Sequence, residues 1–206
     1  VLMGANGAGK STLLKTLLGL LPPVEGEVKL LEKGLSSYDR TERACLLAGM
    51  LTGVQRPGRM TVSSFIGTGR YPHHPWYRKK QDRDVIDQAA ERAGIAHLLD
   101  RSVSDISDGE YQRTLFGRMI AQGALVWIMD EPMAFLDISG RMRQYDLLQD
   151  ACLEMGISIL ISTHDPELAA RDGNTCWLMG KGELTEMSTG SACREQILEH
   201  FSVRND

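Results

Sequence analysis

The chain has 206 residues, of which 42% are hydrophobic, and 23 Lys and Arg residues against 27 Asp and Glu residues give it a formal net charge of −4. Its length predicts a single domain with a sizeable core, and its acidic balance argues against a dedicated nucleic-acid-binding protein, which usually carries a basic excess. We find no apolar stretch long enough to span a bilayer and no signal peptide. The four cysteines are scattered and lack the spacing of metal ligands, which favours reduced thiols in a cytosolic protein. They are Cys45, Cys152, Cys176 and Cys193.

A glycine-rich segment lies almost at the start of the chain and fits the P-loop pattern of a glycine, four free positions and Gly-Lys-Ser. Its residues are Gly4, Ala5, Asn6, Gly7, Ala8, Gly9, Lys10, Ser11 and Thr12. Such glycines let successive backbone N–H groups point into one concavity at a helix N-terminus, where phosphate oxygens bind. We expect Lys10 to reach the β- and γ-phosphates and the Ser11 hydroxyl to ligate Mg²⁺. The alternative is a glycine-rich turn that binds nothing.

Apolar segments flank this loop on both sides. Residues 1–3 predict the end of a buried strand. Leucines at helical spacing predict a helix with one face in the core, which Pro22 and Pro23 end: Leu13, Leu14, Leu17, Leu18 and Leu21. Strand, glycine loop and helix are the context that a P-loop requires. Because the chain starts so close to this loop and without Met, we expect further strands upstream of Val1.

The following segments predict core elements and then a long connection. Residues 25–31 predict a strand with one solvated face. Residues 43–51 predict the end of a helix that runs into a buried strand. Residues 53–78 are rich in Gly, Pro and Arg, which indicates a connection that contains a short helix at 62–67.

The middle of the chain is predicted to be helical and to lack strands. Helices are expected at 82–93 and at 107–122 from the spacing of their apolar residues. We therefore expect one domain of two parts, a helical lobe at 56–122 inserted into an α/β core lobe at 1–55 and 123–206.

The core pattern resumes near residue 125. Residues 125–129 are a continuous apolar run, which indicates a central parallel strand buried on both faces. A second buried strand is expected at 157–162, and Asp165-Pro166 predicts the start of a helix. The other expected elements are a helix at 141–155, a hairpin of 175–179 with 183–187 and a final helix at 191–201.

Asp130 and Glu131 follow the apolar strand directly, at the end where α/β sheets bind ligands. We expect Asp130 to hold Mg²⁺ through water and Glu131 to orient the water that attacks the γ-phosphate. His164, which follows the next buried strand, could donate to the same phosphate. By themselves the two acids would be ordinary loop residues and His164 a structural one, but the P-loop favours the catalytic roles.

A second candidate phosphate site begins the helix at 107–122. Ser107, Asp108, Gly109 and Glu110 form a Ser-x-x-Glu capping box. The same serine hydroxyl and glycine N–H groups at a helix N-terminus can bind phosphate. Because one nucleotide already has the P-loop, we infer that this site serves a nucleotide bound to another copy. Asp137, a turn beyond Glu131, would by itself be a helix N-cap.

The order of these motifs resembles that of ABC-type ATPase domains over essentially the whole chain. The motifs are the P-loop, residues 107–110, Asp130-Glu131-Pro132, residues 135–137 and residues 162–164. The resemblance implies a P-loop NTPase (RecA-like) core of the α/β class with a parallel sheet and an inserted all-helical subdomain. It implies an ATPase whose cofactors are ATP and Mg²⁺, with two such domains sandwiching two ATP molecules.

The resemblance also assigns roles to single residues. By resemblance, residues 6–12 correspond to Walker A, Ser11 and Asp130 correspond to the magnesium residues, and Glu131 corresponds to the catalytic base. Residues 107–110 correspond to the signature that binds the partner's ATP, Asp137 to the D-loop aspartate and His164 to the switch histidine. Lys10 and His164 would stabilise the transferring phosphoryl group.

Several stretches resemble one branch of the family, which drives bacterial import of ferric siderophores, haem or vitamin B12. They are Met60-Thr61-Val62, residues 69–73, the Asp108 of the signature and residues 134–137. This branch implies a homodimer on the cytoplasmic face of the inner membrane, integral-membrane permease subunits, and a periplasmic or surface substrate-binding protein acting indirectly. The alternatives are an importer of another substrate and a soluble ABC-type ATPase that acts on DNA or ribosomes.

The chain departs from the family pattern at four points. Ala5 replaces the usual Pro, and Met133 replaces the usual Thr. Thr52 occupies the Q-loop position, where a glutamine normally touches Mg²⁺ and signals to the membrane subunit, and Gln55 lies close by. The aromatic residue that stacks on adenine lies upstream of the P-loop in this family and is not present in this chain.

Overall fold

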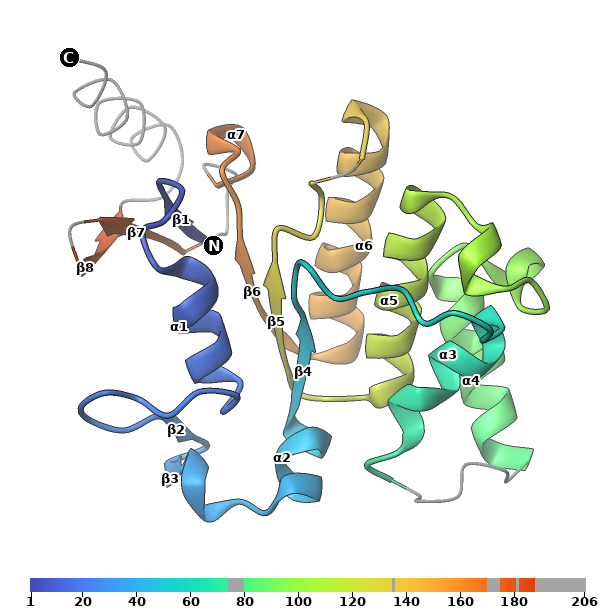
Figure 1. Ribbon diagram of the computed structural model, residues 1–206, viewed down its shortest axis with the longest axis horizontal. Coiled ribbons are helices and arrows are strands. Elements are labelled where there is room, and N and C mark those ends of the chain that lie inside the picture. The colour runs from blue at the N-terminus through green and yellow to red at the C-terminus, as the bar shows by residue number, and fades with distance from the viewer. Residues whose placement is uncertain (74–79, 135, 170–174, 181, 188–206) are drawn as a thin grey trace.

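The computed structural model describes residues 1–73, 80–134, 136–169, 175–180 and 182–187, so Cys193, Phe135 and the expected helix at 191–201 lie outside the described residues. A six-stranded sheet in the order β4-β5-β6-β1-β7-β8 forms the centre of the molecule (Figure 1). Strand β8 is antiparallel to β7, and the other neighbours are parallel. The strands are β1 (Leu2–Gly4), β4 (Leu47–Met50), β5 (Val126–Asp130), β6 (Ser158–Ser162), β7 (Cys176–Gly180) and β8 (Glu183–Met187).

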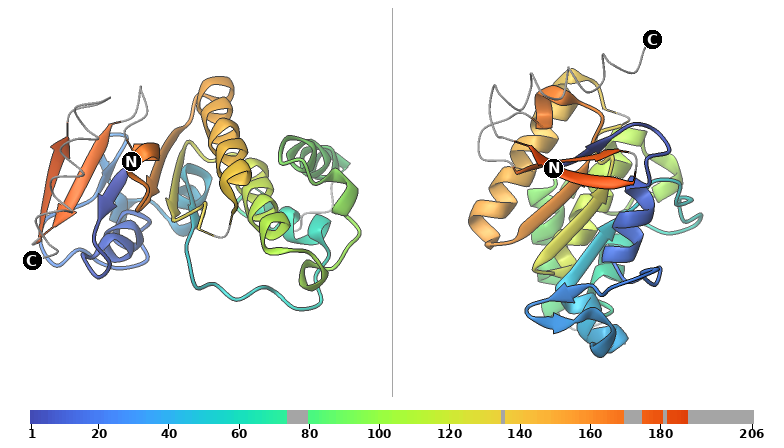
Figure 2. Two further views of the ribbon diagram at one scale, coloured as in Figure 1. Left: turned by 90° about the horizontal axis from the view of Figure 1, so that it is seen from above. Right: turned by 90° about the vertical axis from the view of Figure 1, so that its left-hand side faces the viewer.

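Helices cover both faces of this sheet. Helix α1 (Lys10–Leu17) lies on one face, and α5 (Asp108–Gln122) and α6 (Ile138–Met155) lie on the other (Figure 2). The other helices are α2 (Arg40–Leu46), α3 (Val62–Gly67), α4 (Lys80–Arg92) and α7 (Pro166–Ala169), with 3-10 turns at Leu35–Ser37, Thr68–Arg70, Ala96–Leu98 and Val103–Asp105. No helix within the described residues is long and apolar enough to cross a membrane.

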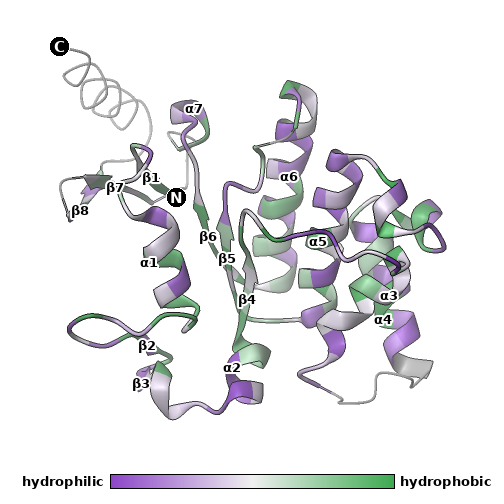
Figure 3. Cartoon of the chain, in the orientation of Figure 1, coloured by the Kyte–Doolittle hydropathy of each residue, from purple (hydrophilic) through white to green (hydrophobic). Residues whose placement is uncertain are grey.

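The strand β5 is buried on both faces, as its apolar run predicts. Trp127 and Met129 belong to the core cluster that contains α5 and α6 residues, whereas Ile128 belongs to the cluster on the side of α1. Trp127 packs edge-on against Phe116 of α5, with ring centroids 5.5 Å apart. Figure 3 shows the hydrophobic residues of β4, β5 and β6 running along the middle of the molecule. Burial on both faces explains why the sequence of this strand is a continuous apolar run and does not alternate between apolar and polar residues.

The register of the parallel strands brings three loops to one edge of the sheet. Leu2 of β1 and Asp130 of β5 are both partners of Ser162 in β6. The carboxyl ends of these neighbouring strands therefore lie together, and the segments that follow them meet at that edge. This edge carries the P-loop, Glu131 and His164.

The segment between β4 and β5 contains α3, α4, α5 and an isolated bridge between Thr61 and Ser102, and its described residues contain no strand. Residues 69–73, the stretch that resembles the importer branch, contact the last turn of α5. Arg70 donates to the carbonyl oxygen of Ala121 at 2.8 Å, and the His73 ring lies 2.7 Å from that of Gln122. These contacts satisfy helix-end carbonyls that have no partner within the helix.

Two local predictions were wrong. Helix α1 ends at Leu17 and not at Pro22-Pro23, because Gly19 adopts a left-handed conformation with φ of 68°. Beyond this turn Leu21 is 40% exposed, so it does not extend the apolar face of the helix. The strand expected at 25–31 is reduced to β2 (Lys29–Leu30), which pairs with β3 (Lys33–Gly34) across a tight turn.

Candidate functional site

The P-loop connects β1 to α1 and has the backbone shape that its glycines allow. Gly7 and Gly9 have φ of 80° and 102°, values that other residues rarely adopt. Gly9 is the N-cap of α1 and offers no side chain to cap it. The N–H groups of the first helical turn are therefore free to bind an external anion.

The Lys10 side chain folds back over this loop. Its ammonium group donates to the carbonyl oxygens of Gly4 at 2.7 Å and Ala5 at 3.1 Å, and the residue is 7% exposed. An ammonium group has three N–H bonds, so a further one can reach a phosphate oxygen in the concavity. The positive charge is thus held at the phosphate position by the fold itself.

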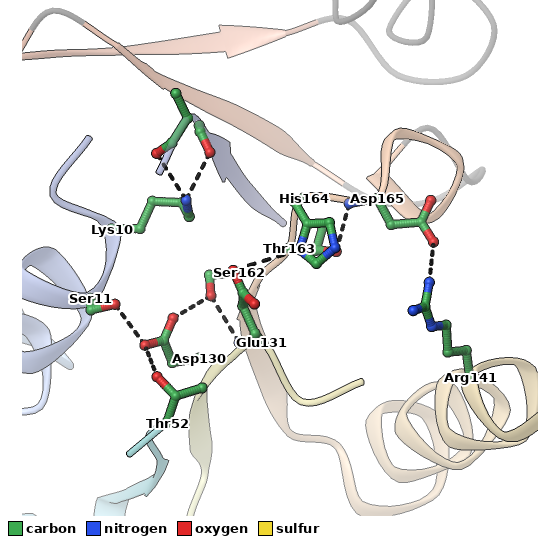
Figure 4. Close-up of polar contacts among 12 residues, drawn as sticks. Lys10, Ser11, Thr52, Asp130, Glu131, Arg141, Ser162, Thr163, His164 and Asp165 are labelled. Carbon is green, nitrogen blue, oxygen red and sulfur yellow. Dashed lines mark hydrogen bonds and ion pairs between the residues drawn. The ribbon is translucent and has the colours of Figure 1, made fainter. Parts of the chain in front are cut away.

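Three hydroxyl groups converge on the Asp130 carboxylate at the end of β5 (Figure 4). Oδ2 accepts hydrogen bonds from Ser11 at 2.7 Å and from Thr52 at 3.0 Å. Oδ1 accepts one from Ser162 of β6 at 2.6 Å. Burial alone would raise the pKa of Asp130, but these hydrogen bonds and the Lys10 charge outweigh it, and the pKa lies below its ordinary value. Asp130 is therefore a carboxylate at neutral pH.

A cleft of about 500 Å³ opens beside this cluster. It is lined by Asn6, Gly7, Gly9, Lys10, Ser11, Thr12, Thr52, Asp130, Glu131 and Ala134. The convergent hydroxyl and carboxylate oxygens are the donors that Mg²⁺ prefers, and Mg²⁺ usually completes its shell with water and substrate phosphates. This set of oxygen donors fits Mg²⁺, and binding of Mg²⁺ at this site stays a prediction. Of the two candidates for the Q-loop role, Thr52 is the one that reaches Asp130.

Glu131 is held in a strained conformation beside the cleft. Its φ of 48° lies in the left-handed region, and its backbone N–H donates to the Ser162 hydroxyl at 3.0 Å. The side chain points toward His164, with Oε1 3.6 Å from Nδ1 (Figure 4). Backbone strain of this kind occurs where a site requires it. The structure thus brings His164 beside Glu131, which lines the cleft together with Lys10 and Ser11.

Residues 107–110 form the capping box that their sequence predicts. The Ser107 hydroxyl accepts from the Glu110 N–H at 3.3 Å, and the Glu110 carboxylate accepts from the Ser107 N–H at 2.8 Å. The hydrogen bond from the Ser107 backbone has the largest effect in lowering the pKa of Glu110, and the bond from the Ser107 side chain adds to it. None of the four lines the cleft beside the P-loop. Figure 1 shows the start of α5 beyond β5 and α6 from that loop.

Asp137 is the N-cap of α6. Its Oδ1 accepts from the Gly140 N–H at 2.8 Å, and its Oδ2 accepts from the Ser139 hydroxyl at 3.1 Å. The bond from Gly140 and then that from Ser139 lower the pKa of this carboxyl. The capping role that the sequence offered is therefore present, and a role toward a second copy stays a prediction.

Comparison with known proteins decides the family. The model of the ABC transporter family matches residues 1–134 of the chain. The chain belongs to the ABC transporter family. The predicted ABC-type ATPase and its P-loop NTPase fold are thereby confirmed.

Similar proteins in this family include named importer components. The chain is 33% identical over 185 residues to the ferric enterobactin transport ATP-binding protein FepC of Escherichia coli, covering 89% of this chain and 68% of FepC. It is 35% identical over 208 residues to the hemin import ATP-binding protein HmuV of Burkholderia ambifaria, covering 91% and 76%. A solved transporter of the metal-chelate type in an inward-facing conformation superposes with a TM-score of 0.78 at 25% identity, covering 95% of this chain and 72% of that one.

Two residues near the ABC motifs were not assigned a role from the sequence. Ser162 bridges β5 and β6 by bonding both Asp130 and the Glu131 backbone. A hydroxyl residue at the end of a strand next to β5 was the available signal for it. Arg56 contacts Asp108 of the signature across a sequence separation of 52 residues, which no local pattern reveals.

Replacing Ser162 by Ala should lower the free energy of unfolding by about 1–3 kcal/mol at pH 7, because it leaves the partly buried Glu131 N–H without its acceptor. The depressed pKa of Asp130 contributes stability that is present above the unfolded pKa and is lost as the pH falls through the folded one. Since the variant depresses this pKa less, the difference between the two proteins should shrink below about pH 4. Urea unfolding across this pH range measures it. Ser158→Ala, at the exposed start of the same strand, is the control; equal stability of Ser162→Ala and parent would contradict the bridging role.

Proposed function

We propose that this chain is the ATP-binding and ATP-hydrolysing subunit of a bacterial ABC importer for an iron–siderophore chelate, haem or cobalamin. The convergence of Ser11, Thr52 and Asp130 beside Lys10 carries the ATPase part of the proposal. Membership of the ABC transporter family supports ATP-driven transport. The cargo class is supported by relatives named for ferric enterobactin, hemin and achromobactin transport.

The P-loop binds the phosphates of ATP in this mechanism. The Lys10 ammonium and the N–H groups at the start of α1 contact the β- and γ-phosphates. Ser11 and Asp130, with the Thr52 hydroxyl beside them, are the residues that would hold Mg²⁺. When bound, the ion neutralises charge that develops on the phosphate oxygens. The depressed pKa of Asp130 keeps this carboxylate charged for that role.

Glu131 acts on the attacking water. Its carboxylate accepts a hydrogen bond from the water and orients it toward the γ-phosphorus. His164, whose ring nitrogen lies 3.6 Å from that carboxylate, donates to the γ-phosphate and limits the positions open to Glu131. Lys10, which lines the same cleft as Glu131, stabilises the transferring phosphoryl group.

A second copy completes each ATP site. Residues 107–110 of one copy bind the ATP held by the P-loop of the other, and Asp137 lies at the same interface. The observation behind this step is that the helix start at Ser107 does not line the cleft of its own chain. Residues 56–122 act as a helical lobe and residues 1–55 and 123–206 as a core lobe, so that the signature can move relative to the P-loop.

The dimer works with partners at the membrane. Integral-membrane permease subunits receive the closing motion at the cytoplasmic face of the inner membrane, and a periplasmic or surface binding protein delivers the cargo to them. No nucleic acid takes part, since the net charge of −4 opposes phosphate-backbone binding.

The size of the Glu131→Gln protein in solution, with and without ATP and Mg²⁺, tests this proposal. Blocking hydrolysis should trap the closed state, so sedimentation should change from monomer to dimer only with ATP and Mg²⁺ both present. ADP in place of ATP is the control for nucleotide binding without a γ-phosphate. A protein that binds ATP but stays monomeric at all concentrations would contradict the two-copy site.

A further inference from the structure

Arg56 bridges the segment after β4 to the start of α5. Its guanidinium group donates to the carbonyl oxygen of Ile106 at 2.8 Å and forms an ion pair with the carboxylate of Asp108. It also stacks over the ring of Tyr111, 4.6 Å from the ring centroid. Three contacts from one side chain therefore hold the residue before the N-cap, the first residue of the helix and its first turn.

The same segment contacts the magnesium cluster at its other end. Thr52, four residues earlier, donates to Asp130 at 3.0 Å. Four residues span at most about 14 Å of extended chain. Segment and helix together line a groove of about 630 Å³ that reaches from Asp130 to Asp108 and includes Arg56. A short piece of chain thus links the Asp130 carboxylate to the helix that carries residues 107–110.

The charge of Asp108 gives this link a chemical consequence. Asp108 is the first residue of α5, and its side chain is 75% exposed. A carboxylate at this position favours the helix, because it lies at the positive end of the helix dipole. The same carboxylate repels a phosphate group that approaches the helix start, unless a cation neutralises it. Arg56 is the cation that the fold places against it.

We propose that Arg56 is a positioning residue that neutralises Asp108 and fixes the start of α5, so that residues 107–110 can receive the γ-phosphate of ATP bound to a second copy. The proposal rests on the proposed function. It makes residues 52–56 a strut between a chain's own magnesium cluster and the phosphate site that it offers to its partner.

Arginine suits this position better than lysine does. A planar guanidinium group can donate to the Ile106 carbonyl and the Asp108 carboxylate at once while it lies over the Tyr111 ring. A lysine ammonium keeps the charge but cannot make these three contacts in one plane. Charge neutralisation and helix positioning can therefore be separated by substitution.

The test uses the Glu131→Gln chain as the parent and measures ATP-dependent dimerisation by sedimentation, with a fluorescent ATP analogue to measure nucleotide affinity of the monomer. Arg56→Gln should weaken the dimer about 10-fold, the effect of losing one partly exposed charge-assisted contact. Nucleotide affinity should stay within about twofold, since Arg56 does not line the P-loop cleft. Arg59→Gln, an exposed residue of the same segment, is the matched control and should change neither value.

Two further variants separate the charge from the packing. Asp108→Asn added to Arg56→Gln should restore part of the lost dimer, because it removes the unpaired carboxylate, and Arg56→Lys should lie between parent and Arg56→Gln. The proposal is overturned if Arg56→Gln dimerises like the parent, or if the double variant is as weak as Arg56→Gln. A parent that fails to bind ATP would instead defeat the proposed function itself, so the two failures are distinguishable.

Discussion

Glu131→Gln will lower the rate of ATP hydrolysis by about 10²–10⁴-fold, the usual contribution of a positioned general base. Gln has nearly the size of Glu but an uncharged amide in place of the carboxylate, so it cannot take a proton from the attacking water. The side chain leaves from a left-handed backbone fixed by Ser162 and lies beside His164, so the substitution should not change its position. ATP affinity should change little, because phosphate binding rests on the P-loop. Phosphate release at saturating ATP measures the rate.

Glu154→Gln provides the matched control for this experiment. Glu154 lies near the end of α6, where it is exposed and pairs with Arg92, and it makes no part of the cleft. Its variant should hydrolyse ATP like the parent, since an exposed ion pair contributes little. Undiminished hydrolysis by Glu131→Gln would show that another group activates the water.

Much of the fold follows from local patterns that have one physical solution. The apolar run at 125–129 has too few polar residues for a solvated face, so a central parallel strand is its only stable place, and β5 occupies it. The short helix predicted at 62–67 has the bounds of α3, and the structure shows that the Thr61 side chain caps its first turn. The end of α1 was missed because prolines outweighed a single glycine, whose left-handed conformation ends the helix earlier.

The site was predictable where it depends on motifs and unpredictable where it depends on distant contacts. The motif around each residue is enough to predict the roles of Lys10, Ser11, Asp130 and Glu131. The chemistry of Thr52 could not be predicted in this way, since the family pattern expects glutamine there. Its bond to Asp130 and its place in the cleft lining come from the structure. Ser162 and Arg56 act through strand register and a long-range ion pair, which a single sequence does not encode locally.

Lys10→Met will weaken ATP binding by about 10²-fold, because it removes the charge-assisted hydrogen bonds to the phosphates, each worth about 1.5–3 kcal/mol. Methionine keeps most of the length and the apolar stem of lysine, so the buried position stays filled. The carbonyl oxygens of Gly4 and Ala5 lose a donor, and the free energy of unfolding should fall as well. Calorimetric titration with ATP and Mg²⁺ measures the affinity, and urea unfolding measures the stability.

The two effects of this substitution can be told apart. Lys15→Met removes a positive charge from the exposed face of the same helix and leaves the P-loop intact, so both its ATP affinity and its stability should match the parent. Stability loss alone would weaken binding only near the unfolding transition, whereas loss of the phosphate contact acts at every temperature at which the protein is folded. A folded Lys10→Met protein that binds ATP as tightly as the parent would remove Lys10 from the nucleotide site, and with it the interpretation of residues 4–12 as a P-loop.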